Sequence, residues 1–255
     1  MKKALLAAIV LLLGAASARA LDHEPEEGLS WQAQFGMNVS KIHGYFDIID
    51  GTSFKMNNKA GVDIAIKGEY YLPDAHGTYI SLGLEWTQKG GKRKGLEYPS
   101  RFDDEEDNVP YPGTHKVTEH YISIPIHVGF RYNFSDDWGI FGEFGPYFAI
   151  GVAGHNRFDT EREGYPANTA NFKYATFKEN GDADMACWGF QRFDTGIGFR
   201  VGAEYLKHYS VNVGCDWGLT DMLRGEYRDA FGTEYQYNAD KLKNFCISIT
   251  LGYRF

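Results

Sequence analysis

The chain has 255 residues, of which 26 are basic and 34 are acidic, so its formal net charge is −8 at pH 7. An acidic balance of this size argues against nucleic acid as a partner. The three cysteines, Cys187, Cys215 and Cys246, have neither the number nor the spacing of a disulfide framework or a zinc site. We therefore expect a protein without a metal ion or other cofactor.

The first twenty residues predict a secretory signal peptide. Two lysines precede an apolar run over residues 4–13, and an A-x-A cleavage site ends at Ala20. The apolar run is too short to span a membrane as an anchor helix. Cleavage after Ala20 would leave 23 basic and 34 acidic residues, a net charge of −11. We interpret residues 1–20 as the leader and residues 21–29 as an N-terminal periplasmic linker.

Eight later segments alternate between apolar and polar residues with period two, which predicts β-strands. They cover residues 31–39, 62–70, 80–87, 121–132, 140–152, 192–205, 211–219 and 245–255. The last segment shows the pattern most clearly, with Phe245, Ile247, Ile249, Leu251, Tyr253 and Phe255 on one face. Its eleven residues are about the length with which a tilted strand crosses a bilayer. No segment after the leader predicts a transmembrane helix, and the mean hydropathy is −0.41.

The predicted connections alternate between short and long. Five to nine residues follow the second, fourth and sixth strands, whereas 22 to 39 follow the first, third, fifth and seventh. Loops of that length are uncommon in a compact soluble domain. They are typical of outer-membrane barrels, which have short periplasmic turns and long external loops. The pattern predicts an all-β protein, an eight-stranded antiparallel up-and-down transmembrane β-barrel over residues 30–255, in the bacterial outer membrane.

The apolar face is expected to point outward, toward lipid. The polar faces combine both charge signs with many glycines, and aromatic residues recur near the strand ends, where they form belts at lipid interfaces. These aromatic residues are Trp31, Tyr70, Trp86, Tyr132, Trp217 and Tyr253. With this orientation Cys215 points outward and Cys246 inward, so no bridge joins them. A soluble lipid-binding barrel with an apolar interior is the alternative.

An eight-stranded barrel is only just wide enough for its own side chains, so charges inside it must pair. The expected lumen charge network comprises Lys67, Glu69, Glu85, His127, Arg131, Glu143, Arg192, Asp194, Arg200, Glu204, Asp216 and Arg254. Hairpin pairing of the sixth and seventh strands places Arg200 opposite Gly214 and diagonal to Asp216. Pro125 and Pro146 are expected at one height in the wall, as a bulge or a weakened seam.

Several short motifs resemble the outer-membrane β-barrel family that includes PorT. They are Trp86-Thr87-Gln88-Lys89-Gly90, Tyr121-Ile122-Ser123-Ile124-Pro125, Gly145-Pro146-Tyr147, Gly196-Ile197-Gly198, Gly202-Ala203-Glu204-Tyr205, Gly218-Leu219-Thr220 and Leu251-Gly252-Tyr253-Arg254-Phe255. The resemblance implies an outer-membrane barrel without family catalytic residues, and some relatives serve protein secretion. Family members commonly carry an acid where this chain has Ser123. The end of the last strand, Tyr253 and Phe255, resembles the signal that the barrel assembly machinery reads.

A non-enzymatic barrel is the preferred interpretation, with a structural or secretion-associated role; a small-solute channel and an enzyme acting on lipid or peptide are the alternatives. Ser123 and His127 share one strand face but lie about 13 Å apart, too far for proton transfer. The acidic run over residues 103–107 lacks the ligand spacing of a calcium site.

The connection over residues 154–189 is rich in aromatic residues, which can either bind a protein partner or pack on one another. The candidates for a partner site are Tyr165, Phe172, Tyr174, Phe177 and Trp188. The other expected partners are outer-membrane lipid, including lipopolysaccharide, and the barrel assembly machinery.

Overall fold

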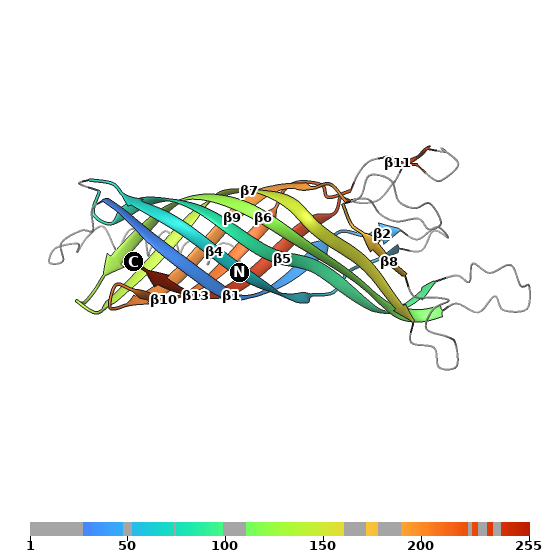
Figure 1. Ribbon diagram of the computed structural model, residues 1–255, viewed down its shortest axis with the longest axis horizontal. Coiled ribbons are helices and arrows are strands. Elements are labelled where there is room, and N and C mark those ends of the chain that lie inside the picture. Colours follow the sequence, from blue (N-terminus) through green and yellow to red (C-terminus); the bar gives the residue numbers. More distant parts are fainter. Residues whose placement is uncertain are drawn as a thin grey trace, which may run out of the picture.

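The computed structural model describes residues 28–47, 53–73, 75–98, 111–160, 172–177, 190–223, 226–228, 234–236 and 241–255. Eight strands form the wall (Figure 1): β1 (Gly28–His43), β4 (Lys59–Tyr71), β5 (Thr78–Tyr98), β6 (Tyr111–Asn133), β7 (Trp138–Thr160), β9 (Phe193–Tyr205), β10 (Tyr209–Gly218) and β13 (Lys243–Arg254). Five short strands, β2 (Phe46–Asp47), β3 (Ser53–Phe54), β8 (Phe172–Ala175), β11 (Glu226–Arg228) and β12 (Glu234–Gln236), lie in the long connections. Among the described residues, no helix could span a membrane.

The eight wall strands close into a ring. Each pairs antiparallel with the next along the chain, the β6–β7 pairing is present, and β13 pairs with β1. Both ends of the ring's sequence, Gly28 in β1 and Arg254 in β13, lie at the rim of the short turns. The predicted eight-stranded antiparallel up-and-down barrel is confirmed, and closure leaves no unpaired strand edge in the bilayer, where such an edge would be costly.

An apolar belt surrounds the barrel. Its side chains alternate with buried ones along the wall strands, and on β6 it runs from Ile122 to Tyr132. A strand of this length at a tilt of about 40° covers roughly 25 Å, the height of an outer-membrane lipid band. Representative members are Phe35, Ile64, Leu82, Ile124, Phe144, Phe199, Val211 and Leu251, all at least 36% exposed. The apolar face therefore points outward, and the alternative of an apolar interior is wrong.

Three neighbouring strands are much longer than a bilayer crossing requires. β5 has 21 residues, and β6 and β7 have 23 each, whereas β10 has 10. Their extra length lies at the end of the barrel away from the short turns, where the sheet projects beyond the other wall strands (Figure 1). The sequence prediction made these strands too short, ending β5 and β7 too early and beginning β6 too late, because polar residues replace the apolar ones on their outer face there. We call this part, residues 88–98, 111–120 and 153–160, the projecting sheet.

Pro125 and Pro146 lie at one height, as expected. Pro125 pairs with Tyr147, and the ladder loses two pairs before it resumes at Val128 and Phe144 in the same register. The prolines therefore interrupt the β6–β7 ladder without a bulge, and the register shift lies instead beside His120. The two described cysteines also match the prediction: Cys215 and Cys246 point to opposite faces and neither forms a disulfide.

Candidate functional site in the lumen

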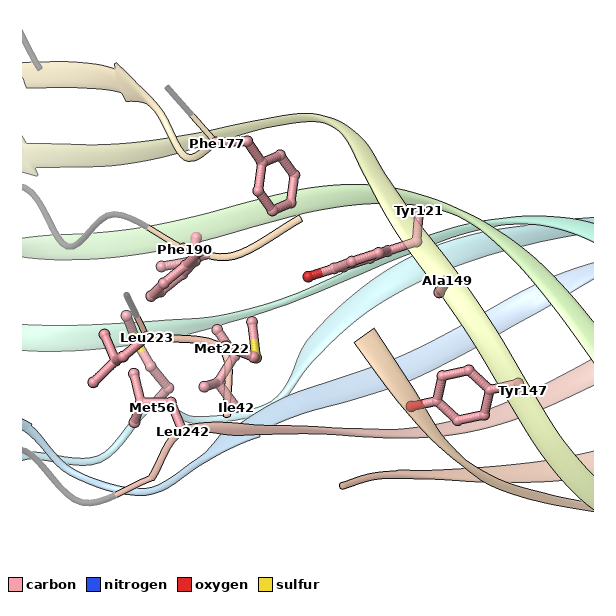
Figure 2. Close-up of a cluster of buried hydrophobic side chains, with 11 residues drawn as sticks. Ile42, Met56, Tyr121, Tyr147, Ala149, Phe177, Phe190, Met222, Leu223 and Leu242 are labelled. Carbon is pink, nitrogen blue, oxygen red and sulfur yellow. The ribbon is translucent and has the colours of Figure 1, made fainter. Parts of the chain in front are cut away.

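The external mouth of the lumen is filled by a hydrophobic cluster, which we call the cap (Figure 2). It comprises Ile42, Met56, Val117, Tyr121, Tyr147, Ala149, Phe177, Phe190, Met222, Leu223 and Leu242. The wall supplies Ile42, Val117 and the deeper residues, and the long connections supply the others. Each large apolar side chain that leaves water here contributes about 1.5–3 kcal/mol. The cap therefore folds parts of the first, third and fourth long connections against the barrel.

Backbone hydrogen bonds join the cap segments to one another. The N–H of Phe190 donates to the carbonyl of Thr176 at 3.1 Å, and the N–H of Gln191 donates to the carbonyl of Met222 at 2.7 Å. The N–H of Met222 in turn donates to the carbonyl of Leu242 at 2.8 Å. Pieces of the last two long connections are thus held together across the mouth.

Beneath the cap lies an upper polar layer. The Lys89 ammonium lies 3.8 Å from Asp194 and 4.6 Å from the centre of the Tyr147 ring. Asp194 also accepts hydrogen bonds from Tyr147 and from Asn244. The sequence did not predict Lys89 or Glu119 as lumen residues, although both are buried there. Lys89 lies just after the predicted third strand, which ended at residue 87, and Glu119 lies just before the predicted fourth strand, which began at residue 121. The alternation of inward and outward side chains continues after residue 87 and before residue 121, and this signal could have placed both residues in the lumen.

The middle layer is built around Arg200. Its guanidinium lies 3.0 Å from Glu85 and 3.2 Å from Asp216. Arg200 stands directly opposite Gly214, as predicted, and a side-chain carbon on that glycine would approach the arginine stem at 3.3 Å. The glycine therefore provides the room in which the arginine crosses the lumen toward β5.

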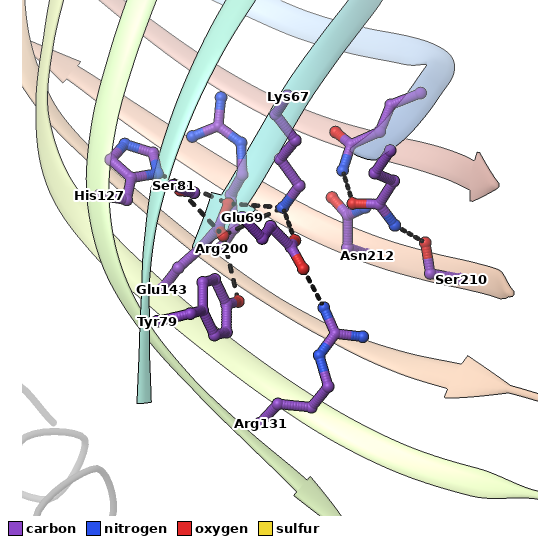
Figure 3. A network of polar contacts seen from close by, with 12 residues as sticks. Lys67, Glu69, Tyr79, Ser81, His127, Arg131, Glu143, Arg200, Ser210 and Asn212 are labelled. Carbon is purple, nitrogen blue, oxygen red and sulfur yellow. Dashed lines mark hydrogen bonds and ion pairs between the residues drawn. The ribbon is translucent and has the colours of Figure 1, made fainter. Parts of the chain in front are cut away.

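The lower layer is a continuous network of three cations and three carboxylates. Figure 3 shows its part around Lys67, Glu69, Arg131 and Glu143. Lys67 lies 3.0 Å from Glu69 and 3.0 Å from Glu143. Arg131 joins Glu69, at 2.7 Å, to Glu204, with which it also forms an ion pair. Arg254 completes the series at 2.5 Å from Glu204. Equal numbers of opposite charges allow this layer to be buried without a net charge, as burial of ions requires.

The structure brings most of the expected network into the lumen. Lys67, Glu69, Glu85, His127, Arg131, Glu143, Asp194, Arg200, Glu204 and Arg254 are buried, and Asp216 is half-buried. Arg192 lies outside it: β9 begins only at residue 193, so Arg192 is exposed at the rim. There its guanidinium donates to the carbonyl of Gly151 and stacks over Phe177.

The aromatic connection is only partly described. Phe177 is buried in the cap, so this aromatic residue packs internally. Phe172 and Tyr174 belong to β8, which extends the projecting sheet beside β7. Tyr165, Trp188, Cys187 and the acidic run over residues 103–107 lie outside the described residues. So do the leader and residues 21–27 of the expected linker over residues 21–29, whose last two residues begin β1.

The catalytic candidates do not form a working arrangement. Ser123 and His127 share the inner face of β6, but Ser81 is the serine directly opposite His127. The Ser81 hydroxyl donates to Glu143 at 3.5 Å, and His127 lies 3.5 Å from the same carboxylate. In a nucleophile–base pair the hydroxyl would instead donate to the imidazole. Among the described side chains, no cluster of His, Cys, Asp or Glu could hold a metal ion.

One buried histidine lies outside the bilayer, in the projecting sheet. His115 on β6 is almost fully buried, and burial lowers its pKa to about 4 because desolvation disfavours the imidazolium. His115 is therefore neutral at pH 7.

The closed ring, the apolar belt and the polar lumen define an integral β-barrel of the bacterial outer membrane. The family model of the outer membrane protein beta-barrel domain matches residues 8–255, and the chain belongs to this family. No curated protein sequence matches the chain.

The solved structures that match the chain include outer-membrane proteins. Ail of Yersinia pestis is 12% identical at a TM-score of 0.39, covering 90% of this chain and 100% of Ail. OprG of Pseudomonas aeruginosa is 12% identical at a TM-score of 0.41, covering 92% of this chain and 99% of OprG. The protease OmpT of Escherichia coli is 12% identical at a TM-score of 0.41, covering 93% of this chain and 99% of OmpT.

Proposed function

We propose that this protein is a non-conducting, non-enzymatic barrel that anchors a folded external surface in the outer membrane. The observation that carries the proposal is the double closure of the lumen, by three layers of paired charges and by the hydrophobic cap above them. A solute would have to separate buried ion pairs such as Arg131–Glu204, which costs several kcal/mol because the partners are left uncompensated. A catalytic role has no support from the arrangement around His127.

The closed lumen predicts that the purified protein gives no steady conductance in planar bilayers. Channels that conduct small solutes have a water-filled interior, which requires many more than eight strands. The measurement is single-channel current at high salt, with a sixteen-stranded porin as the positive control in the same bilayers. Stable, ion-selective openings from the wild-type protein would overturn the proposal and make small-solute passage the leading function.

A secretion-associated role, which the resemblance to PorT suggests, is a form of the same proposal. In that role the external or periplasmic rim would bind another protein, and the barrel itself would remain closed. Co-purification in mild detergent tests this role, since a stable complex with secretion proteins would specify the anchor's task.

The barrel assembly machinery is the partner that we propose for β13. Tyr253 and Phe255 are exposed at the periplasmic end of this strand, with ring centroids 5.2 Å apart. Because both rings point away from the lumen, replacing them by alanine should reduce insertion several-fold without removing a lumen contact. Folded protein in isolated outer membranes measures this effect, and Phe35→Ala, a lipid-facing change in β1, is the control. Normal levels of the double variant would exclude this role.

A further inference from the structure

Exposed cations face one another across the projecting sheet. Lys92 on β5 stands directly opposite Lys116 on β6, and Lys116 stands directly opposite Arg157 on β7. All three side chains are exposed, and the next register position, on β8, is Lys173. We call Lys92, Lys116 and Arg157 the basic ladder. Directly opposed residues have their Cβ atoms about 5 Å apart, so like charges there destabilise the sheet.

The described side chains compensate this repulsion only in part. Arg157 lies 2.6 Å from Asp159, and both members of this pair are well exposed. Among the side chains that the structure describes, Asp159 is the acid on this outer face, since Glu119 is buried on the inner one. Lys92 and Lys116 therefore form a like-charge pair that an external anion would stabilise.

The height of the ladder identifies the source of the anion. Lys116 lies six residues beyond Ile122, the end of the apolar belt on β6. Six residues of a strand tilted by about 40° rise roughly 15 Å. Phospholipid headgroups extend only about 5–8 Å beyond the hydrocarbon. The ladder lies above that zone, at the level of the charged inner-core sugars of an outer-leaflet glycolipid.

We propose that the basic ladder binds the phosphate and carboxylate groups of the lipopolysaccharide inner core. Ammonium and guanidinium groups form strong, charge-assisted hydrogen bonds with these anions. The wall positions the site: the belt fixes the depth of the barrel, and the β5–β6–β7 register brings the cations together. The proposal does not depend on the closed lumen. The conductance experiment and the lipid-binding experiment can therefore fail independently.

The test compares lipopolysaccharide that carries a phosphorylated inner core with lipid A, which ends below the ladder. Each is titrated into the folded protein in detergent, and bound lipid is measured by native mass spectrometry. A cation near an anionic surface contributes about a fivefold change in affinity, so Lys92→Ala with Lys116→Ala should weaken core binding about 30-fold. The affinity for lipid A should not change.

The matched control is Lys207→Asn, which removes a cation from the short turn at the opposite rim. Lys207 has a φ of +59°, a conformation that asparagine tolerates. This control should bind the core-bearing lipid like the wild type. High salt should weaken the binding of that lipid by the control and by the wild type alike. Equal binding by the double variant and the wild type would overturn the proposal. Binding of a soluble sulfated polysaccharide as tightly as the core-bearing lipid would also overturn it, because the ladder would then serve a ligand outside the membrane.

Discussion

Replacing Arg131 by methionine is expected to lower the stability of the folded barrel by about 3 kcal/mol, the low end of the range for breaking a buried ion pair. The guanidinium is almost fully buried and joins Glu69 to Glu204. Methionine fills much of the same space but leaves both carboxylates short of a cation. Arg254 then remains beside Glu204 and limits the loss there. Water entering the lumen would soften the effect, which is why we expect the low end.

The temperature at which the folded band disappears on an unboiled gel measures this loss, together with urea unfolding in lipid vesicles. Arg157→Met is the matched control, because it removes the same group from an exposed pair with Asp159, worth about 0.2–1 kcal/mol. If the two variants unfolded alike, the lower layer would not be a stabilising network and the lumen would be more hydrated than we infer.

Replacing Phe190 by alanine should loosen the cap while the membrane-spanning wall stays folded. Phe190 is fully buried among residues from several long connections, and truncating a buried phenylalanine costs about 3–5 kcal/mol. The cap packs on the end of the wall, so the loss should appear as local opening. A decrease of about 3 kcal/mol in the opening free energy would raise cleavage by an external protease about 100-fold, when opening is fast relative to cleavage.

The experiment adds protease to the outside of vesicles that contain the folded protein and follows the intact band. Phe148→Ala is the control: this phenylalanine lies on β7, but its side chain is 44% exposed on the lipid face. It should leave the cleavage rate unchanged. Rapid cleavage of the wild type would contradict the cap, because the connections would then be open without any substitution.

The sequence by itself determined the class of protein, the order of the strands and the facing of the side chains. Each follows from local information, since period-two alternation assigns every residue to one face and a short turn fixes the register of its hairpin. The position of Arg200 opposite Gly214 is an example, because the turn between β9 and β10 decides it. Alternation failed where the lipid ended: the projecting sheet lost its apolar outer residues, and the strand ends were misplaced.

Only the tertiary structure decided which charges meet across the lumen and what closes its mouth. Arg200 reaches Glu85 over 115 residues of sequence, and Arg131 reaches Glu204 over 73. Such contacts depend on the register of every strand between them and on the closure of the ring. The cap and the basic ladder arise in the same way, from segments that become neighbours only when the barrel closes. The sequence of a single strand determines which face each side chain points to, but the whole ring determines which side chains meet.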